Sequence, residues 1–154
     1  MTKRYGIPLI INDRLDVALA VDADGVHIGT DDMPEKEVRR IIGTRRILGV
    51  SVASYEDFRA SSEADYFGVG ALFPTSSKQD AVLCGTGLVR QIRPLTNLPI
   101  VGIGGINLGN VREALSAGCD GVAVLSGILG SESVLDSARQ FAEYIRSAKN
   151  DKPT

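Results

Sequence analysis

The chain has 154 residues, of which 44% are hydrophobic; this is long enough for one well-packed core and too short to indicate two. Seventeen lysines and arginines against nineteen aspartates and glutamates give a net charge of −2, which is not the basic excess typical of proteins that bind nucleic acid or an anionic membrane. The first residues lack the long apolar run of a signal peptide or a membrane helix. We therefore expect a cytoplasmic protein with small-molecule partners, folded as one domain over residues 1–148 with a polar tail over 149–154.

Short apolar runs rich in β-branched residues alternate with amphipathic stretches along the chain. Strands of a parallel sheet are covered on both faces, so they read as continuous apolar runs. The predicted strands are Ile7–Ile11, Gly25–Ile28, Ile47–Val50, Tyr66–Val69, Pro99–Ile103 and Gly121–Leu125. The predicted helices are Arg14–Val21, Glu35–Ile42, Tyr55–Ser61, Leu88–Leu95, Leu108–Ala117 and Val134–Ala148. Six βα units in this order are typical of a parallel α/β fold, either an open sheet or a barrel.

The two ends of the predicted strands differ in composition. Asp24, Asp65 and Asp120 hold the same place just before three of the strands, and we interpret them as turn formers. The opposite ends run into segments rich in Asp, Ser, Thr and Gly, the residue types that contact phosphate or metal. Chemistry is therefore expected at the edge formed by the carboxyl ends of the strands.

Oxygen donors follow the first two predicted strands. Asn12 and Asp13 come after the first, and Asp31 and Asp32 after the second. Mg²⁺ is commonly bound by one or two carboxylates together with waters and substrate phosphates, so these residues are candidate ligands. Aspartates in such places also cap helices. The spacing leaves the choice between a metal site and two helix caps open.

Loops in the second half of the chain have the composition of anion-binding segments. The connection 70–88 contains PTSSK, whose hydroxyls and lysine can hold phosphate oxygens, although a solvated serine-rich loop has the same composition. The last two strands end in GIGG and LSGI, where glycines let backbone N–H groups approach an anion or simply make a tight turn. Two such turns on consecutive strands favour a phosphate site.

Other reactive side chains give weaker signals. His27 is the only histidine and lies in an apolar strand, where a hydrogen-bonded structural role is more common than catalysis. Ser51 lacks the GxSxG context of a hydrolase, and we interpret it as a phosphate donor. Cys84 and Cys119 follow no metal or redox spacing and are expected to be reduced and structural.

Five segments resemble, in order, the successive strand ends of the thiamine phosphate synthase family: LIINDRLDVALAVDADGVHIGTDD, ILGVSVAS, ADYFGVGALFPTSSK, LPIVGIGGIN and DGVAVLSGI. The combination of IND with a loop similar to PTxTK is the most diagnostic part. The resemblance implies an α/β fold of the TIM (β/α)₈-barrel type with six of the eight βα units. It also implies a Mg²⁺-dependent transferase of thiamine biosynthesis that joins a pyrimidine diphosphate to thiazole phosphate and releases pyrophosphate.

The resemblance assigns a role to each matching position. Asn12 would contact the pyrimidine diphosphate, while Asp13 and Asp32 would bind Mg²⁺. Ser51 and Lys78 would hold the diphosphate and act in catalysis. The thiazole phosphate would be bound by Thr75, Ser76, Ser77, Gly105, Leu125 and Ser126, of which Ser76 and Leu125 rest on the resemblance alone.

The sequence departs from the family pattern in several places. Ser77 stands where the family usually has threonine, Thr30 where glutamine is common, and Ala53 where histidine is frequent. The first two βα units of the family, with their Gln-x-Arg-x-Lys stretch, have no counterpart before Ile7. We therefore expect exposed barrel edges, with self-association through them or poor stability and weak synthase activity.

In the implied reaction, Mg²⁺ and Lys78 stabilise the departing pyrophosphate, and the thiazole nitrogen attacks the pyrimidine methylene as it acquires carbocation character. Two other functions stay open. One is a thiazole tautomerase of the same family, which needs an acid–base residue instead of a metal pair. The other is a catalytically silent module that binds a phosphate ligand. Mg²⁺-dependent pyrophosphate release separates the synthase from both.

Overall fold

The computed structural model describes residues 2–75 and 81–150 of the chain, with the side chains of 148–150 excepted. These residues form two compact units, which divide after Gly68. Unit 1 is residues 1–68 and unit 2 is residues 69–154. The strand β4 (Tyr66–Val69) crosses the division.

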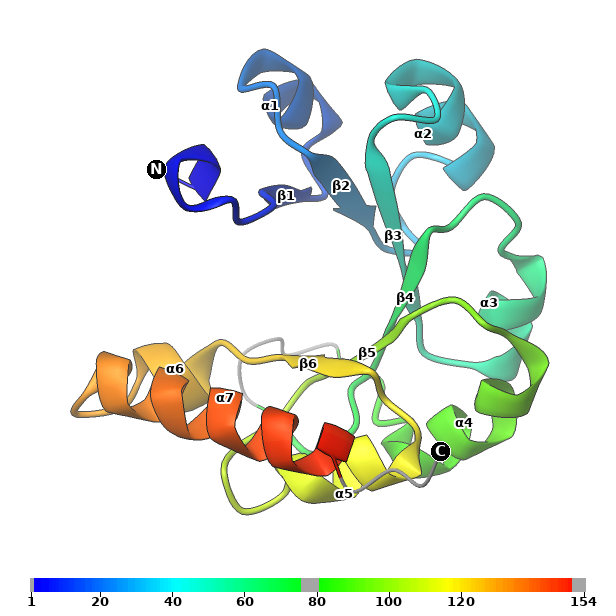
Figure 1. Cartoon of the computed structure of the whole chain (residues 1–154). Helices are drawn as coiled ribbons and strands as arrows, with labels where there is room; N and C mark the ends of the chain where they lie inside the picture. Colours follow the sequence, from blue (N-terminus) through cyan, green and yellow to red (C-terminus); the bar gives the residue numbers. More distant parts are fainter. Residues whose placement is uncertain (1, 76–80, 151–154) are drawn as a thin grey trace. The chain divides into compact units, whose positions relative to one another are not determined.

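Unit 1 is built from alternating parallel strands and helices (Figure 1). Its strands β1, β2 and β3 pair in parallel, with Asn12 level with His27 and His27 level with Gly49. Its elements in chain order are η1 (Thr2–Tyr5), β1 (Ile10–Asn12), α1 (Leu15–Ala20), β2 (Gly25–Ile28), α2 (Glu35–Ile42), β3 (Ile47–Val52) and α3 (Tyr55–Ala60).

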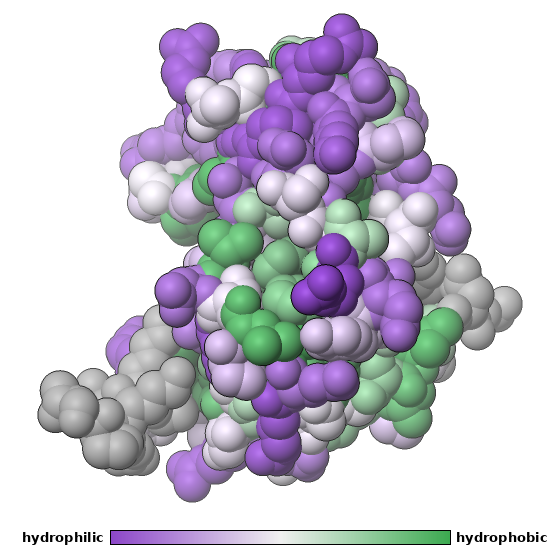
Figure 2. Space-filling view, turned by 90° about the vertical axis from the view of Figure 1, so that its right-hand side faces the viewer, coloured by the Kyte–Doolittle hydropathy of each residue, from purple (hydrophilic) through white to green (hydrophobic). Residues whose placement is uncertain are grey.

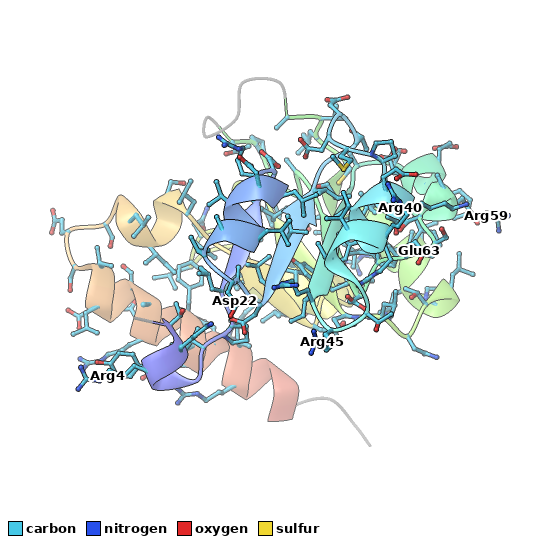
Figure 3. All side chains as sticks on the ribbon, turned by 90° about the horizontal axis from the view of Figure 1, so that it is seen from above. Arg4, Asp22, Arg40, Arg45, Arg59 and Glu63 are labelled. Atoms are coloured by element: carbon cyan, nitrogen blue, oxygen red, sulfur yellow. The ribbon has the colours of Figure 1, made fainter. Side chains whose placement is uncertain are left out.

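The side chains of β2 in unit 1 divide between a buried core face and an opposite, partly exposed face. Val26 and Ile28 are buried, and His27 points to the opposite face because successive side chains of a strand alternate. Figure 1 shows α1 and α2 on the same side of these strands. Their polar faces point to solvent, and Figure 3 shows Arg40 at the periphery.

Unit 2 contains a parallel strand pair with helices around it. Strands β5 (Ile100–Ile103) and β6 (Gly121–Ala123) pair in parallel, with Val101 level with Gly121. The other elements are α4 (Gly85–Ile92), η2 (Arg93–Leu95), α5 (Val111–Ala117), α6 (Ser126–Leu129) and α7 (Val134–Asn150). Helix α7 packs on α5 and α6, and its Phe141 is buried.

The six predicted strands and six predicted helices are all present, which confirms the βα order. Their bounds differ where local chemistry intervenes. The first strand begins at Ile10 and not at Ile7, which is 57% exposed and precedes a proline that lacks an N–H donor. Helix α5 begins at Val111 because the side-chain oxygen of Asn110 accepts from the Asn107 N–H and holds a turn there.

Two further differences concern the helices of unit 2. The short helix α6 was not predicted. Helix α7 includes residues 149 and 150, which were expected to belong to a tail, and residues 151–154 lie outside the described part. Within that part, no helix combines the length and apolarity needed to cross a membrane.

The three repeated aspartates do form turns before their strands, as predicted. The Oδ2 atoms of Asp24, Asp65 and Asp120 accept the backbone N–H groups of Leu9, Leu48 and Ile100 at 2.7, 2.8 and 2.9 Å. The backbone N–H of each aspartate donates in return to the carbonyl of its partner, which is Leu9, Leu48 or Ile100 respectively. Each aspartate thus ties its own strand to the start of the preceding one, and we call this arrangement the aspartate clamp.

Candidate active site

The predicted metal and diphosphate residues of unit 1 gather at the carboxyl ends of its strands. Asn12 ends β1, Asp13 follows it, Asp32 follows β2 and Ser51 lies near the end of β3. The backbone N–H of Asp13 donates to the carbonyl of His27 at 2.8 Å, which keeps Asp13 beside β2. We call Asn12, Asp13, Asp32 and Ser51 the unit 1 cluster.

Neither predicted metal ligand occupies the N-cap position of the helix that follows it. Helix α1 has Arg14 at its N-cap and α2 has Pro34, and neither of these residues caps its helix with a side-chain hydrogen bond. Asp32 turns back towards β2, where its Oδ2 accepts the Gly29 N–H at 2.7 Å. This contact favours the metal interpretation over the capping interpretation for Asp32.

The backbone around these carboxylates suits an exposed polar site. Asp13 adopts a positive φ of 61°, a conformation that few residues other than glycine take up and that is common near functional sites. Among the described residues, no group of three or more His, Cys, Asp or Glu side chains is placed to hold a metal ion. Mg²⁺ needs only one or two carboxylates when waters and substrate phosphates complete its shell, so the number and type of these side chains are compatible with that ion.

His27 joins the unit 1 cluster through a contact that the sequence did not indicate. Its Nε2 lies 3.0 Å from the Ser51 Oγ, and its Nδ1 lies 2.9 Å from the Tyr66 hydroxyl. Burial lowers the pKa of His27, and the carboxylate of Asp32 acts in the opposite direction. The predicted structural, hydrogen-bonded role is confirmed, but one of its partners is a candidate ligand of the diphosphate.

Glycines on the neighbouring strands make room for this contact. Gly49 and Gly68 share one sheet face with His27, and small residues across neighbouring strands make room for a large ring.

In unit 2, the turn after β5 holds the segment that carries Thr75. The Leu72 and Phe73 N–H groups donate to the carbonyls of Ile103 and Gly104 at 2.9 and 3.1 Å, so the chain before Thr75 runs along the end of β5. A Cβ on Gly105 would lie 2.6 Å from the Phe73 carbonyl oxygen. The glycines at 104 and 105 therefore allow the turn after β5 to pack closely against the segment before Thr75. Neither the phosphate interpretation nor the simple-turn interpretation of these glycines had included this packing.

The turn after β6 approaches the same place. A Cβ on Gly127 would lie 2.8 Å from the Ile106 carbonyl oxygen, so the SGI segment packs directly on the GGI segment. Leu125 and Ser126 precede this contact and are exposed, Leu125 to 62%. We call Thr75, Gly105, Leu125 and Ser126 the unit 2 cluster. Ser76, Ser77 and Lys78 lie outside the described residues, so their predicted roles stay predictions.

The two cysteines have the structural character expected of them. Cys119 is buried, and the Cys84 thiol donates to the Ala71 carbonyl at 3.3 Å. Burial raises the pKa of Cys84, which works against a thiolate nucleophile.

A βα-repeat fold with carboxylates and tight glycine turns at the carboxyl ends of its strands defines a parallel α/β enzyme of the type that binds phosphorylated substrates. The sequence model of the family described as thiamine monophosphate synthase matches residues 1–128. The chain belongs to this family, and the resemblance stated above is confirmed.

Curated relatives match almost the whole chain. A thiamine-phosphate synthase of Alkaliphilus oremlandii is 48% identical over 95% of this chain and 71% of its own length. One of Clostridium tetani is 49% identical over 94% of this chain and 70% of its own length. The chain therefore spans about seven-tenths of the length of these relatives.

Solved structures share the fold. A thiamine phosphate pyrophosphorylase from Pyrococcus furiosus matches with a TM-score of 0.87 and 40% identity, over 96% of this chain and 71% of the other. The N-(5′-phosphoribosyl)anthranilate isomerase of the same organism matches with a TM-score of 0.63 and 17% identity, over 94% of this chain and 74% of the other, which shows a likeness of fold alone. The predicted fold class, α/β of the TIM-barrel type with six βα units, is confirmed.

Proposed function

We propose that this protein is a thiamine-phosphate synthase, a transferase that joins a pyrimidine diphosphate to thiazole phosphate and releases pyrophosphate. The observation that carries the proposal is the match to synthases at 48 and 49% identity over nearly the whole chain. The same relatives favour the synthase over the tautomerase and over a silent binding module.

The unit 1 cluster supports a site for Mg²⁺ and the diphosphate. Asp13 and Asp32 would hold the ion, since both residues follow neighbouring parallel strands at their carboxyl ends. Asn12 and Ser51 would donate hydrogen bonds to the pyrimidine diphosphate, with Lys78 as a further donor. When bound, Mg²⁺ supplies positive charge where the leaving pyrophosphate becomes more negative.

The unit 2 cluster supports a site for thiazole phosphate. Thr75 is brought beside the turn at Gly105, and the segment of Leu125 and Ser126 packs on the same turn. Hydroxyl and backbone N–H groups that converge from three loops suit the several oxygens of one phosphate. Ser76 and Ser77 would belong to the same site.

Two further features of the proposed enzyme are its location and its association. We propose a cytoplasmic enzyme, in keeping with its family and with two cysteines that form no disulfide.

Self-association of the chain is supported by apolar side chains at the surface. These include Ile7 next to β1, which is 57% exposed, and Leu125 next to β6, which is 62% exposed. Figure 2 shows a different face of the molecule, on which apolar residues also lie among polar ones.

The proposed function is tested by a pyrophosphate-release assay on the purified chain. The reaction contains the pyrimidine diphosphate, thiazole phosphate and Mg²⁺, and each component is omitted in turn. The synthase proposal expects pyrophosphate only when all three are present. Isomerisation of a thiazole without pyrophosphate release would select the tautomerase, and binding of thiazole phosphate without turnover would select the silent module.

A further inference from the structure

The imidazole of His27 bridges two hydroxyl groups on one face of unit 1. Its Nδ1 lies 2.9 Å from the Tyr66 hydroxyl and its Nε2 lies 3.0 Å from the Ser51 Oγ. The His27 and Tyr66 rings lie beside each other, with centroids 5.4 Å apart. The bridge therefore connects a half-buried phenol to a serine of the unit 1 cluster.

Glycines fix the ring of His27 in this position. A Cβ on Gly68 would lie 2.7 Å from the His27 Cε1, and a Cβ on Gly49 would overlap both the His27 and the Tyr66 rings. Real Cβ atoms do not approach other atoms so closely, so only glycine at these two places leaves room for the bridge. Because the backbone at Gly49 and Gly68 lies against the His27 ring, the imidazole is held in one orientation.

A neutral imidazole has one donor and one acceptor nitrogen, so the bridge can run in two directions. In the first, the Tyr66 O–H donates to Nδ1 and the Nε2–H donates to the Ser51 Oγ, which leaves the Ser51 proton for an outside acceptor. In the second, Ser51 donates to Nε2 and has no proton left for an anion. Burial raises the pKa of Tyr66 and lowers that of His27.

We propose that Tyr66 and His27 are positioning residues that hold Ser51 as a dedicated hydrogen-bond donor to the diphosphate of the substrate. The hydrogen bonds run in one direction from Tyr66 through His27 to Ser51 and end on a phosphate oxygen. The inference rests on the proposed function, in which Ser51 contacts the diphosphate. A donor that is already oriented loses little rotational freedom when the anion binds.

The tautomer of His27 gives a test that does not depend on activity. His27 is the only histidine of the chain, so ¹⁵N NMR of the untagged protein shows imidazole signals of this residue alone. We expect the Nε2–H tautomer near neutral pH, in the free protein and with inorganic pyrophosphate and Mg²⁺ added. A dominant Nδ1–H tautomer would overturn the proposed direction.

Variants test whether the bridge acts on anion binding, measured by calorimetry with inorganic pyrophosphate and Mg²⁺. Tyr66→Phe removes one hydroxyl and keeps the ring, and Tyr5→Phe is the matched control on a tyrosine that is 68% exposed. His27→Leu removes the donor to Ser51, whereas His27→Gln keeps an N–H donor on a flexible chain. We expect Kd to rise about 10-fold or more in His27→Leu, by less in Tyr66→Phe and His27→Gln, and not at all in Tyr5→Phe.

Kinetics separate this inference from the proposed function. Tyr66→Phe and both His27 variants should raise KM for the pyrimidine diphosphate more than they lower kcat, whereas Tyr5→Phe should change neither. Ser51→Ala should raise KM at least as much as these variants. If Ser51→Ala weakens pyrophosphate binding while His27→Leu and Tyr66→Phe bind like wild type, the bridge has no positioning role and the synthase proposal stands. If wild-type protein releases no pyrophosphate from its substrates, the proposed function fails first.

Discussion

Single aspartates perform two different tasks at opposite ends of the strands. Asp24, Asp65 and Asp120 sit before strands and accept backbone N–H groups, which makes them parts of the scaffold. Asp13 and Asp32 follow strands, and the N-cap positions of the next helices are held by other residues. Residue type alone does not distinguish the two tasks, but position in the βα unit does, and each task predicts a different response to mutation.

Asp65 tests the structural task. Its Oδ2 accepts from the Leu48 N–H and also from the Arg39 guanidinium at 2.7 Å, and the Arg39 side chain is only 13% exposed. Asp65→Ala leaves the Leu48 N–H without its side-chain acceptor and removes the ion pair of Arg39, which keeps its bonds to backbone carbonyls. We expect the free energy of unfolding to fall by about 1–2 kcal/mol in urea titrations. Asp22→Ala is the control, because Asp22 pairs with Lys3 and Arg46 at 72% exposure, and its loss should lower the free energy of unfolding less than the loss of Asp65 does. Equal losses in both variants would contradict the clamp.

Asp32 tests the metal task. Asp32→Asn keeps an oxygen that can accept the Gly29 N–H but removes the negative charge that Mg²⁺ requires. We expect the Mg²⁺ concentration for half-maximal pyrophosphate release to rise at least about 10-fold, with little change in unfolding free energy. The neighbouring Asp31→Asn should leave the Mg²⁺ dependence unchanged. The metal assignment would be refuted by wild-type Mg²⁺ dependence in Asp32→Asn.

At the scale of elements, the turn after β5 organises the unit 2 cluster. Gly105 has a φ of 65° and no room for a Cβ beside the Phe73 carbonyl. Gly105→Ala should therefore lower the unfolding free energy by about 1–3 kcal/mol and weaken thiazole phosphate binding. Gly87→Ala is the matched control, since a Cβ at Gly87 in α4 meets nothing within 4 Å and alanine favours a helix. Thermal unfolding and calorimetry with thiazole phosphate measure both effects, and unimpaired binding by Gly105→Ala would argue against this turn as a phosphate site.

The sequence predicted the elements better than their ends. Apolar runs located all six strands, and β2 and β4 have the predicted bounds because turn residues flank them on both sides. Helix α5 starts later than predicted because side-chain hydrogen bonds of Asn107 and Asn110 compete with the helix. The contact of His27 with Ser51 and Tyr66 depends on the register of three strands, which a single sequence does not specify.

At the scale of the whole molecule, apolar side chains at the surface predict self-association. Ile7, Val82, Leu125 and Leu129 are each more than half exposed. Burying such groups between chains is favourable by roughly 25 cal/mol per Å² of apolar area. We expect sedimentation to show concentration-dependent oligomers, and Leu125→Ser with Leu129→Ser to reduce them. A monomer throughout the micromolar range would contradict this prediction.

The central claim is that the chain is a thiamine-phosphate synthase. The most direct test is the stoichiometry of products in one reaction containing the pyrimidine diphosphate, thiazole phosphate, Mg²⁺ and purified protein. The proposed function predicts thiamine phosphate and pyrophosphate in equal amounts, with neither formed when Mg²⁺ is chelated. Unchanged substrates at high protein concentration, or pyrophosphate without thiamine phosphate, would contradict it.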